Sequence, residues 1–453
     1  MPAPTDIRIA DVVCGFEPVP FRAPLKFGGR VVDGSQNINV TVTAETPDGR
    51  RATGFGSMPL GHIWGWPAKT LEPDQTAEAV RRTAVAIGTH AHAHRGFGHP
   101  LDLVSELEHD WPAIADSVCT DLGFAERMPL LMTLVAASPL DAAIHDAYGR
   151  VHGRNVYDCY GPEWVSRDLA EFIAPEFAGE HLDRYTLRSP KPAMPLYHLV
   201  GALDPLTAGD VAKPVGDGLP ETLEQWIAAE GLTHLKIKLN GEDLAWDVAR
   251  VAAVDRVASG ADPAGPPRAW NYSLDFNEKC SSVEYVLEFL ARLAEAAPAA
   301  MDRVQYVEQP TARDLRAHPE NKMHRASAIK PVVIDESLTD LPTLLLALEQ
   351  GYTGIALKAC KGQTHALLMG AYAQKHGLFL CVQDLTCPGA SFLHSAGIAA
   401  RLPTVAAIEG NARQFCPAGN RGWAERFPGL FQVRNGRIAT GLLTRPGLGH
   451  TSD

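Results

Sequence analysis

The 453-residue sequence has little of several features that would place it in a specialised class of protein. Its eight cysteines are scattered without a Cys-x-x-Cys pair, so we interpret them as reduced thiols that serve as small core residues. No stretch approaches about 18 uninterrupted apolar residues, which argues against a transmembrane helix. Residues 1–13 lack the basic and apolar regions of a secretory signal. We therefore expect a cytoplasmic protein without a membrane partner.

Positive charge is also scarce. The formal net charge is −12, and because nucleic acids and anionic membranes require clustered Lys and Arg, neither is an expected partner. An anionic small molecule stays compatible with this charge, since local cations in a site outweigh a distant net charge. The sequence also lacks GxSxG, HExxH, GxGxxG and P-loop motifs. Its composition is that of an ordinary globular protein, and we expect a homo-oligomer.

The first 190 residues mix strand and helix patterns. Residues 36–43 alternate between polar and apolar types as a strand does, and the turn at 47–49 should lead into a second strand. The apolar spacing predicts helices over 74–88, 102–117 and 139–152. Proline and glycine are dense between residues 187 and 220, which indicates a linker and irregular loops. We interpret 1–190 as an α+β capping domain.

From about residue 194, short apolar runs alternate with helical stretches. Eight runs are typical of strands: MPLYHLV, HLKIKL, WNYSLDF, VQYVEQ, PVVIDE, TGIALK, LFLCVQ and TVAAIEG. Helices are expected between them, among others over 242–258, 282–297, 341–350 and 363–376. Polar residues end seven of the runs at intervals close to the roughly 30 residues of a βα unit. The pattern predicts a (β/α)₈ TIM-type barrel over 191–425, with 426–453 packing back on the capping domain.

Three of these strand-end residues are carboxylates: Asp275, Glu308 and Asp335. A single acidic residue at a strand end is usually a helix N-cap or a solvated loop residue. Three on consecutive strands of a barrel would converge above its mouth, where their charges would raise one another's pKa. A hard divalent cation resolves this repulsion, and oxygen-only ligation favours Mg²⁺ or Mn²⁺. Asn277 and Glu336 are expected to support this metal site or to add ligands.

Two lysines lie on one face of the strand Leu235–Leu239, because side chains of a strand alternate. In an open sheet Lys236 and Lys238 would simply face water. In a closed barrel they would point into the mouth, and each cation would lower the pKa of the other towards a value useful to a general base. Lys358 would reach in from across the site. Lys361 is a competitor for this role, but we expect it in the following loop or helix.

At this point the sequence resembles the enolase superfamily. The segments HLKIKLNGEDLAWDVARV, LDFN, VEQP, IDES and IALKACKG are similar to its muconate-lactonizing-enzyme and dipeptide-epimerase type, and PLDAAIHDAYGRVHGRNVYDCYG resembles its helix from capping domain to barrel. The resemblance implies metal ligands at the three carboxylates. It also implies acid/base lysines at Lys238 and Lys358, on opposite faces of the substrate.

The sequence departs from this family pattern in places that bear on the substrate. Extra material occurs near residues 60–130 and 162–193, and the seventh strand ends in Gln383 and Asp384 rather than a histidine. The eighth strand ends in Glu409 and Asn411, where family members contact substrate. The loop that carries His62 and Trp64 falls where the family places a capping loop, although a surface turn packed by its own tryptophans is a close alternative.

The predicted chemistry is Mg²⁺-dependent removal of a proton next to the carboxylate of a small acid, giving a metal-stabilised enolate. With a second lysine opposite the first, racemisation, epimerisation or cycloisomerisation would follow. An acid-sugar dehydratase is the alternative within this chemistry. A barrel that binds metal and carboxylate without catalysis is the alternative from another class. The sequence leaves the substrate open.

Overall fold

The computed structural model describes residues 2–27, 30–261 and 269–450. Its N-terminal part contains a three-stranded antiparallel sheet in the order β1-β2-β3. The strands are β1 Arg8–Phe27, β2 Arg30–Glu45 and β3 Arg51–Pro59. The predicted strand 36–43 lies within β2, and the expected turn connects it to β3.

Four helices accompany this sheet: α2 Pro73–Ala93, α3 Pro100–Glu108, α4 Trp111–Asp121 and α5 Leu130–Val151. The prediction of one helix over 102–117 is wrong, because α3 ends at Glu108 and α4 begins at Trp111. Pro112 lies in the first turn of α4, a position where its missing N–H costs no helical hydrogen bond. An uninterrupted helix through Pro112 would lose such a bond.

Helix α5 begins nine residues before the predicted start at 139 and continues through Pro139. Proline cannot donate to the carbonyl of Val135, but the hydroxyl of Ser138 donates to that oxygen at 2.9 Å. The helix lies directly on β3, where Gly54 and Gly56 leave room for it. A Cβ at Gly56 would stand 1.9 Å from the carbonyl oxygen of Pro139, so this close approach requires glycine.

The next part of the chain forms eight parallel strands, and pairing of the first with the last closes them into a barrel. The strands are β4 Met194–Val200, β5 His234–Lys238, β6 Asn271–Asp275, β7 Val304–Glu308, β8 Val332–Ile334, β9 Gly354–Lys358, β10 Phe379–Gln383 and β11 Val405–Glu409. Every predicted barrel strand is present. The predicted (β/α)₈ barrel with an N-terminal α+β region is therefore confirmed.

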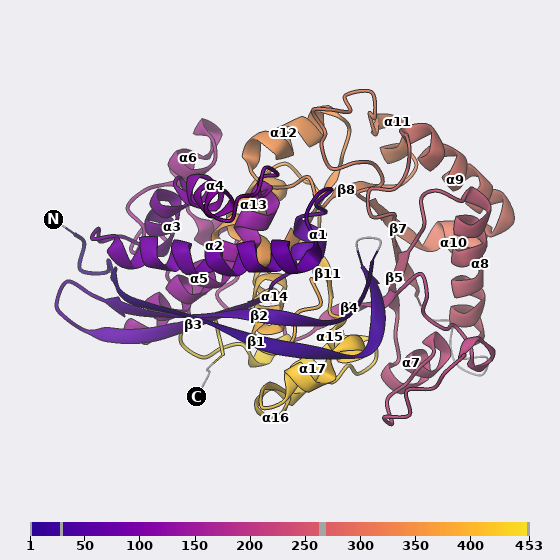
Figure 1. The fold of residues 1–453 in the computed structure, drawn as a ribbon, viewed down its shortest axis with the longest axis horizontal. Coiled ribbons are helices and arrows are strands. Elements are labelled where there is room, and N and C mark those ends of the chain that lie inside the picture. The colour runs from indigo at the N-terminus through magenta and orange to yellow at the C-terminus, as the bar shows by residue number, and fades with distance from the viewer. Residues whose placement is uncertain (1, 28–29, 262–268, 451–453) are drawn as a thin grey trace.

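Helices follow the barrel strands as expected: α7 Leu223–Glu230, α8 Leu244–Gly260, α9 Val283–Ala296, α10 Pro298–Arg303, α11 His324–Ser327, α12 Leu341–Glu349, α13 Gln363–Lys375 and α14 Ala390–Arg401. Shorter elements are α1 His62–Gly65, α6 Leu169–Phe172, α15 Ala412–Phe415, α16 Trp423–Arg426, α17 Pro428–Phe431 and β12 Arg437–Ile438. Single 3₁₀ turns are η1 Val156–Asp158, η2 Pro175–Phe177, η3 Leu182–Arg184, η4 Ala208–Asp210, η5 Ala359–Lys361, η6 Pro417–Asn420 and η7 Thr440–Leu442. Figure 1 shows the N-terminal sheet and α2 beside the barrel, and β1 contacts α15.

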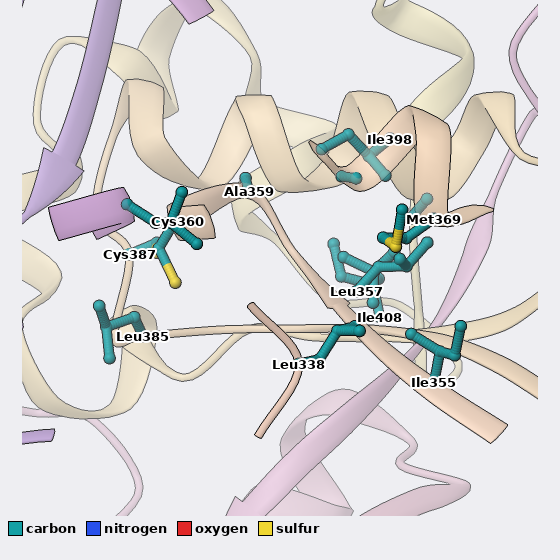
Figure 2. Close-up of a cluster of buried hydrophobic side chains, with 14 of the residues drawn as sticks. Leu338, Ile355, Leu357, Ala359, Cys360, Met369, Leu385, Cys387, Ile398 and Ile408 are labelled. Carbon is teal, nitrogen blue, oxygen red and sulfur yellow. The ribbon is translucent and has the colours of Figure 1, made fainter. Parts of the chain in front are cut away.

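The barrel interior below the mouth is filled by side chains from alternating strand positions, including Tyr197, Tyr306 and Cys381. A second apolar layer lies between the strands and the outer helices. Figure 2 shows part of it, with Leu357 of β9 near Met369 of α13. All eight cysteines are free and seven are buried, as expected for thiols used in packing.

The C-terminal segment contacts both parts of the molecule. Strand β12 pairs antiparallel with β4, while the amide of Leu448 donates to Asp146 of α5 at 2.9 Å. The domain boundaries at 190/191 and 425/426 stay a prediction. Among the helices of the described residues, none combines the length and the apolar composition that crossing a bilayer would require.

Candidate active site

The strand β5 places Lys236 at the centre of the barrel mouth, where it is buried. Its ammonium group donates to Glu308 at 2.9 Å, Gln383 at 3.0 Å and Glu409 at 3.0 Å, and lies 3.1 Å from Asp275. Burial alone would lower the pKa of Lys236, but these carboxylates raise it well above its usual range. The expectation that neighbouring lysines lower each other's pKa is therefore wrong for Lys236, because carboxylates surround it.

Lys238 lies two residues further along the same face and is held by the loop after β6. Its ammonium group contacts Asp275 and donates to the side-chain oxygen of Asn277 at 3.0 Å. Asn277 and Glu278 both have positive φ angles, 47° and 67°. A left-handed backbone is strained for residues other than glycine, although Asn tolerates it best, and such strain often occurs at functional sites.

The three predicted metal ligands lie on adjacent strands and are almost completely buried. Asp275 is the register partner of Glu308, and Asp335 follows β8 directly. Burial and the nearby Asp275 raise the pKa of Glu308 well above its usual range. The pKa of Asp275 and that of Asp335 are both lowered, because lysine ammonium groups outweigh the effect of burial.

Lys358, at the end of β9, faces the mouth from the other side. Its ammonium group lies 2.9 Å from Asp335 and 4.4 Å from the centre of the Trp64 ring, close enough for a cation–π interaction. Burial opposes its charge, yet Asp335 raises the pKa of Lys358 above its usual range. The lysine is thus enclosed between a carboxylate and an indole.

Lys361, the competitor of Lys358 in the sequence, also lies at the site. It lies in η5, the turn after β9, in agreement with the expected loop or helix, but its ammonium group reaches back to Asp335. It is buried, and burial lowers the pKa of Lys361 despite the nearby Asp335. Its only signal in the sequence is its place three residues after Lys358.

Trp64 comes from α1 in the N-terminal part and is buried against the barrel. Its indole N–H donates to Glu336 at 2.9 Å, and its carbonyl oxygen accepts from Arg313 at 3.1 Å. The guanidinium of Arg313 donates two hydrogen bonds to Glu278, and its backbone amide donates a third. Burial and Asp335 raise the pKa of Glu336 to about 7. Nothing in the sequence pattern pointed to Arg313.

His62 begins α1, two residues before Trp64. It interacts with Arg81 and Asp74 of α2, and burial together with Arg81 lowers the pKa of His62 to about 4. Neither His62 nor Glu336 lines the cavity at the barrel mouth. A role for His62 in substrate binding stays a prediction.

The ends of β10 and β11 complete the polar rim. Gln383 donates to Glu308 and accepts from Lys236 at the end of β10. Asp384 accepts from the backbone amides of Asn411 at 2.8 Å and Cys387 at 2.6 Å. Burial and Glu409 raise the pKa of Asp384 to about 6.

A cavity of about 20 Å³ brings most of the predicted residues together. It is lined by Trp64, Leu199, Gly201, Lys236, Lys238, Asn277, Asp335, Lys358, Asp384, Glu409 and Asn411. Asp275 and Glu308 contact its lysines from positions that do not line the cavity. The side-chain oxygen of Asn411 is buried without a hydrogen-bond partner.

The oxygen donors of the site suit a divalent cation in their chemistry but not in their present arrangement. Three buried carboxylates on adjacent strands, and the buried unpartnered Oε2 of Glu336, are the oxygen donors that Mg²⁺ prefers. Within the described ranges, however, no group of three His, Cys, Asp or Glu residues is arranged to hold a metal ion. The carboxylates contact lysines instead, so a cation would compete with ammonium groups for the same oxygens.

The chain belongs to the family described as enolase C-terminal domain-like, whose model matches residues 218–453. The resemblance to the enolase superfamily is thereby confirmed. No curated protein matches the chain.

Solved structures with the same fold include the L-Ala-D/L-Glu epimerase from Bacillus subtilis, at 17% identity and TM-score 0.65 over 98% of both chains. The dipeptide epimerase from Enterococcus faecalis, solved with Mg and L-Leu-L-Tyr, has 17% identity and TM-score 0.62 over 98% of this chain and 99% of that one. A muconate lactonizing enzyme from Pseudomonas fluorescens has 18% identity and TM-score 0.60 over 98% and 97%. At such identities the likeness establishes the fold alone.

Proposed function

We propose that the chain is a Mg²⁺-dependent isomerase or lyase that removes the proton next to the carboxylate of a small acid. One observation carries this proposal: Lys238 and Lys358 reach the mouth from opposite sides of the barrel. Three strands separate β5 from β9 in either direction around the closed sheet. A substrate bound between them would present one face to each lysine.

Asp275, Glu308 and Asp335 would hold the metal ion, Mg²⁺ or alternatively Mn²⁺, with Asn277 and Glu336 beside them. When bound, the ion would supply positive charge that stabilises negative charge developing on the substrate oxygens. That the epimerase from Enterococcus faecalis was solved with Mg supports this choice of metal.

The chain's own residues would carry out the proton transfers. One lysine would take the α-proton and the opposite one would return a proton to the other face, which inverts the centre in a racemisation or epimerisation. Lys236, with its three carboxylate contacts, would keep positive charge beside the substrate. Asp384, Glu409 and Asn411 would contact the rest of the substrate, and Trp64 would limit the access of water to Lys358.

The test is a screen of small carboxylic acids in D₂O with Mg²⁺ and mass detection. We expect at least one acid to gain a deuterium at its α-carbon, with inversion or ring closure. Loss of water from the product would instead identify an acid-sugar dehydratase. Acids that bind with Mg²⁺ but never exchange would identify a non-catalytic binding barrel and contradict the proposal. Lys238→Ala combined with Lys358→Ala is the inactive control. The expected homo-oligomer stays a prediction that sedimentation would check.

A further inference from the structure

The turn η5 and the beginning of α13 determine where two lysines of the mouth lie. The turn connects Lys358, the last residue of β9, to α13, and it ends in Lys361. Ala359 and Cys360 of this turn are buried among apolar side chains (Figure 2). A shift at the beginning of α13 would therefore move both ammonium groups relative to Asp335, which they contact.

Helix α13 receives its N-terminal cap from another part of the chain. Its own N-cap residue is Gly362, which has no side chain, although the first amides of an α-helix have no partner within the helix. Asp141 of α5 supplies the acceptors. Its Oδ2 accepts from the amide of Thr364 at 2.8 Å, and its Oδ1 accepts from the hydroxyl of the same residue at 2.8 Å. The cap thus comes from a residue 223 positions away in the sequence.

Gly362 allows the carboxylate of Asp141 to approach the helix end. Its φ angle of 114° favours glycine, and a Cβ at this position would stand 2.7 Å from Oδ2 of Asp141. Any larger residue would therefore displace Asp141 or the turn. The close approach places the carboxylate directly at the N-terminus of α13, where the helix dipole favours negative charge.

Asp141 depends on this helix end as much as the helix end depends on Asp141. Its side chain is almost completely buried. Within the part of the chain that the structure describes, no Lys or Arg forms an ion pair with it, and the nearest ring nitrogen of His145 lies 3.3 Å away. A buried charge without partners is costly. The two hydrogen bonds from Thr364 therefore stabilise the carboxylate and fix α5 and α13 relative to each other.

His145, one turn further along α5, restricts the arrangement to one order of donors and acceptors. The hydroxyl of Thr364 donates to Asp141, so Nε2 of His145 carries the proton and donates to that hydroxyl oxygen at 2.9 Å. The other ring nitrogen, Nδ1, then accepts from the hydroxyl of Tyr160 at 2.9 Å. All four side chains are buried. The polar contacts between α5 and the beginning of α13 are therefore mutually satisfied.

We infer that Asp141 is a positioning residue for the proton transfer. Its hydrogen bonds go to Thr364, so it acts through the turn η5 and not on the substrate. By capping α13 from α5, it holds Lys358 and Lys361 against Asp335. The effect on catalysis rests on the proposed function, whereas the placement of the two lysines is independent of it.

The first experiment measures the placement of the lysines without turnover. Reductive methylation with formaldehyde, followed by mass spectrometry, gives the reactivity of each lysine. Lys358 and Lys361 should react slowly in the wild-type protein because both are buried. In Asp141→Ala both should react about tenfold faster, since hydrogen bonds to a charged group are lost. Lys238, which β5 positions, should react as before.

Asp146→Ala is the matched control. Asp146 is also buried on α5 and also accepts from backbone amides, but these belong to Phe55 and Leu448 and not to α13. This variant should lose stability without exposing the two lysines. Equal labelling of both lysines in the two aspartate variants would overturn the inference. Should Asp141→Ala fail to fold, Thr364→Val removes only the hydroxyl contact and should raise the labelling by about fivefold; unchanged labelling there would also overturn it.

The second experiment connects this placement to the reaction. Asp141→Ala should lower kcat for α-proton exchange by about tenfold on the face served by Lys358, with little change in KM, because Asp141 does not touch the substrate. The face served by Lys238 should react as in the wild-type protein. Asp141→Asn keeps an acceptor for the amide of Thr364 and should recover most of the rate. Equal slowing on both faces would overturn the positioning role. Exchange of no acid by the wild-type protein would refute the proposed function, while the labelling would still decide whether Asp141 holds the two lysines.

Discussion

The two halves of the barrel mouth hold the same residue type in different surroundings. On the β5–β6 half, Lys238 has 16% of its side chain exposed and polar partners from the barrel itself. On the β8–β9 half, the side chain of Lys358 is 5% exposed and is covered by Trp64 from the N-terminal part. The barrel alone therefore supplies the partners of Lys238. The surroundings of Lys358 also require Trp64 of α1.

The two lysines are therefore positioned by different parts of the molecule. The barrel strands alone define where Lys238 and its aspartate lie, because register fixes both. The surroundings of Lys358 also depend on Arg313, which connects the loop after β7 to the carbonyl of Trp64. Changes in the N-terminal part should consequently affect one face of the substrate more than the other.

The largest expected effect comes from removing each lysine in turn. If the reaction is a two-base epimerisation, Lys238→Ala should still exchange the α-proton of one stereoisomer without converting it, and Lys358→Ala should do so for the other. Loss of a positioned base typically costs about 10²–10⁴-fold in rate. Stereoisomer-resolved exchange in D₂O measures both. Full activity in both variants would remove the lysines from the proton transfer.

The proposed metal ion should affect both halves of the mouth equally, since Glu308 lies on β7 between them. Glu308→Gln removes one ligand charge, and we expect Mg²⁺ to bind at least about 100-fold more weakly, because even outer-shell changes cost 10–100-fold. Calorimetric titration measures the affinity. Asp255→Asn, which disturbs an ion pair with Arg303 far from the mouth, is the control and should bind Mg²⁺ normally. Unchanged affinity in Glu308→Gln would contradict the ligand assignment.

Arg313→Met should change the surroundings of Lys358 but not those of Lys238. A lost hydrogen bond to a charged group costs about 1.5–3 kcal/mol, so we expect roughly tenfold slower exchange on the face served by Lys358. Exchange on the face served by Lys238 should stay unchanged, and backbone hydrogen exchange in residues 61–66 should quicken. Arg325→Met removes an exposed ion pair with Glu284 and serves as the control. Equal slowing on both faces would indicate a general structural defect.

The smallest expected effect is on the pH dependence of the free energy of unfolding, which limits the pH range for comparing the two halves of the mouth. Burial lowers the pKa of His394 to about 3, below its ordinary value near 6.5. Neutral His394 accepts from the amide of Ser57 at 3.2 Å, so its contribution to stability is present above pH 6.5 and is lost as pH falls towards 3. The loss is at most about 1.4 kcal/mol per pH unit. Denaturant unfolding at pH 7.5 and pH 5 should show a smaller decrease for His394→Gln, and an identical decrease would refute this role.

Much of the fold could be predicted because its signals are local. The alternation in HLKIKL placed Lys236 and Lys238 on one face, and the spacing of strand ends indicated a barrel, both of which the structure confirms. The errors arose where local patterns compete. The predicted helix over 102–117 is wrong because the apolar spacing continues across residues 109–110, where α3 has already ended. The predicted start at 139 is wrong because α5 continues through Pro139, where the hydroxyl of Ser138 donates to the carbonyl of Val135 in place of the missing N–H.

Some features of the candidate site could likewise be predicted from the sequence, whereas others depend on the tertiary structure. Because the carboxyl ends of parallel strands gather at one edge, the sequence by itself determined that Asp275, Glu308 and Asp335 would lie near the lysines. Only the tertiary structure decided which ammonium group contacts which carboxylate, and that Lys361, Arg313 and Gln383 take part. Hydrogen bonds such as that from Arg313 to Trp64 join residues 249 positions apart, and burial depends on every element that packs around a group. Sequence periodicity records the conformation of a segment, whereas desolvation and long-range contacts exist only after the chain has closed on itself.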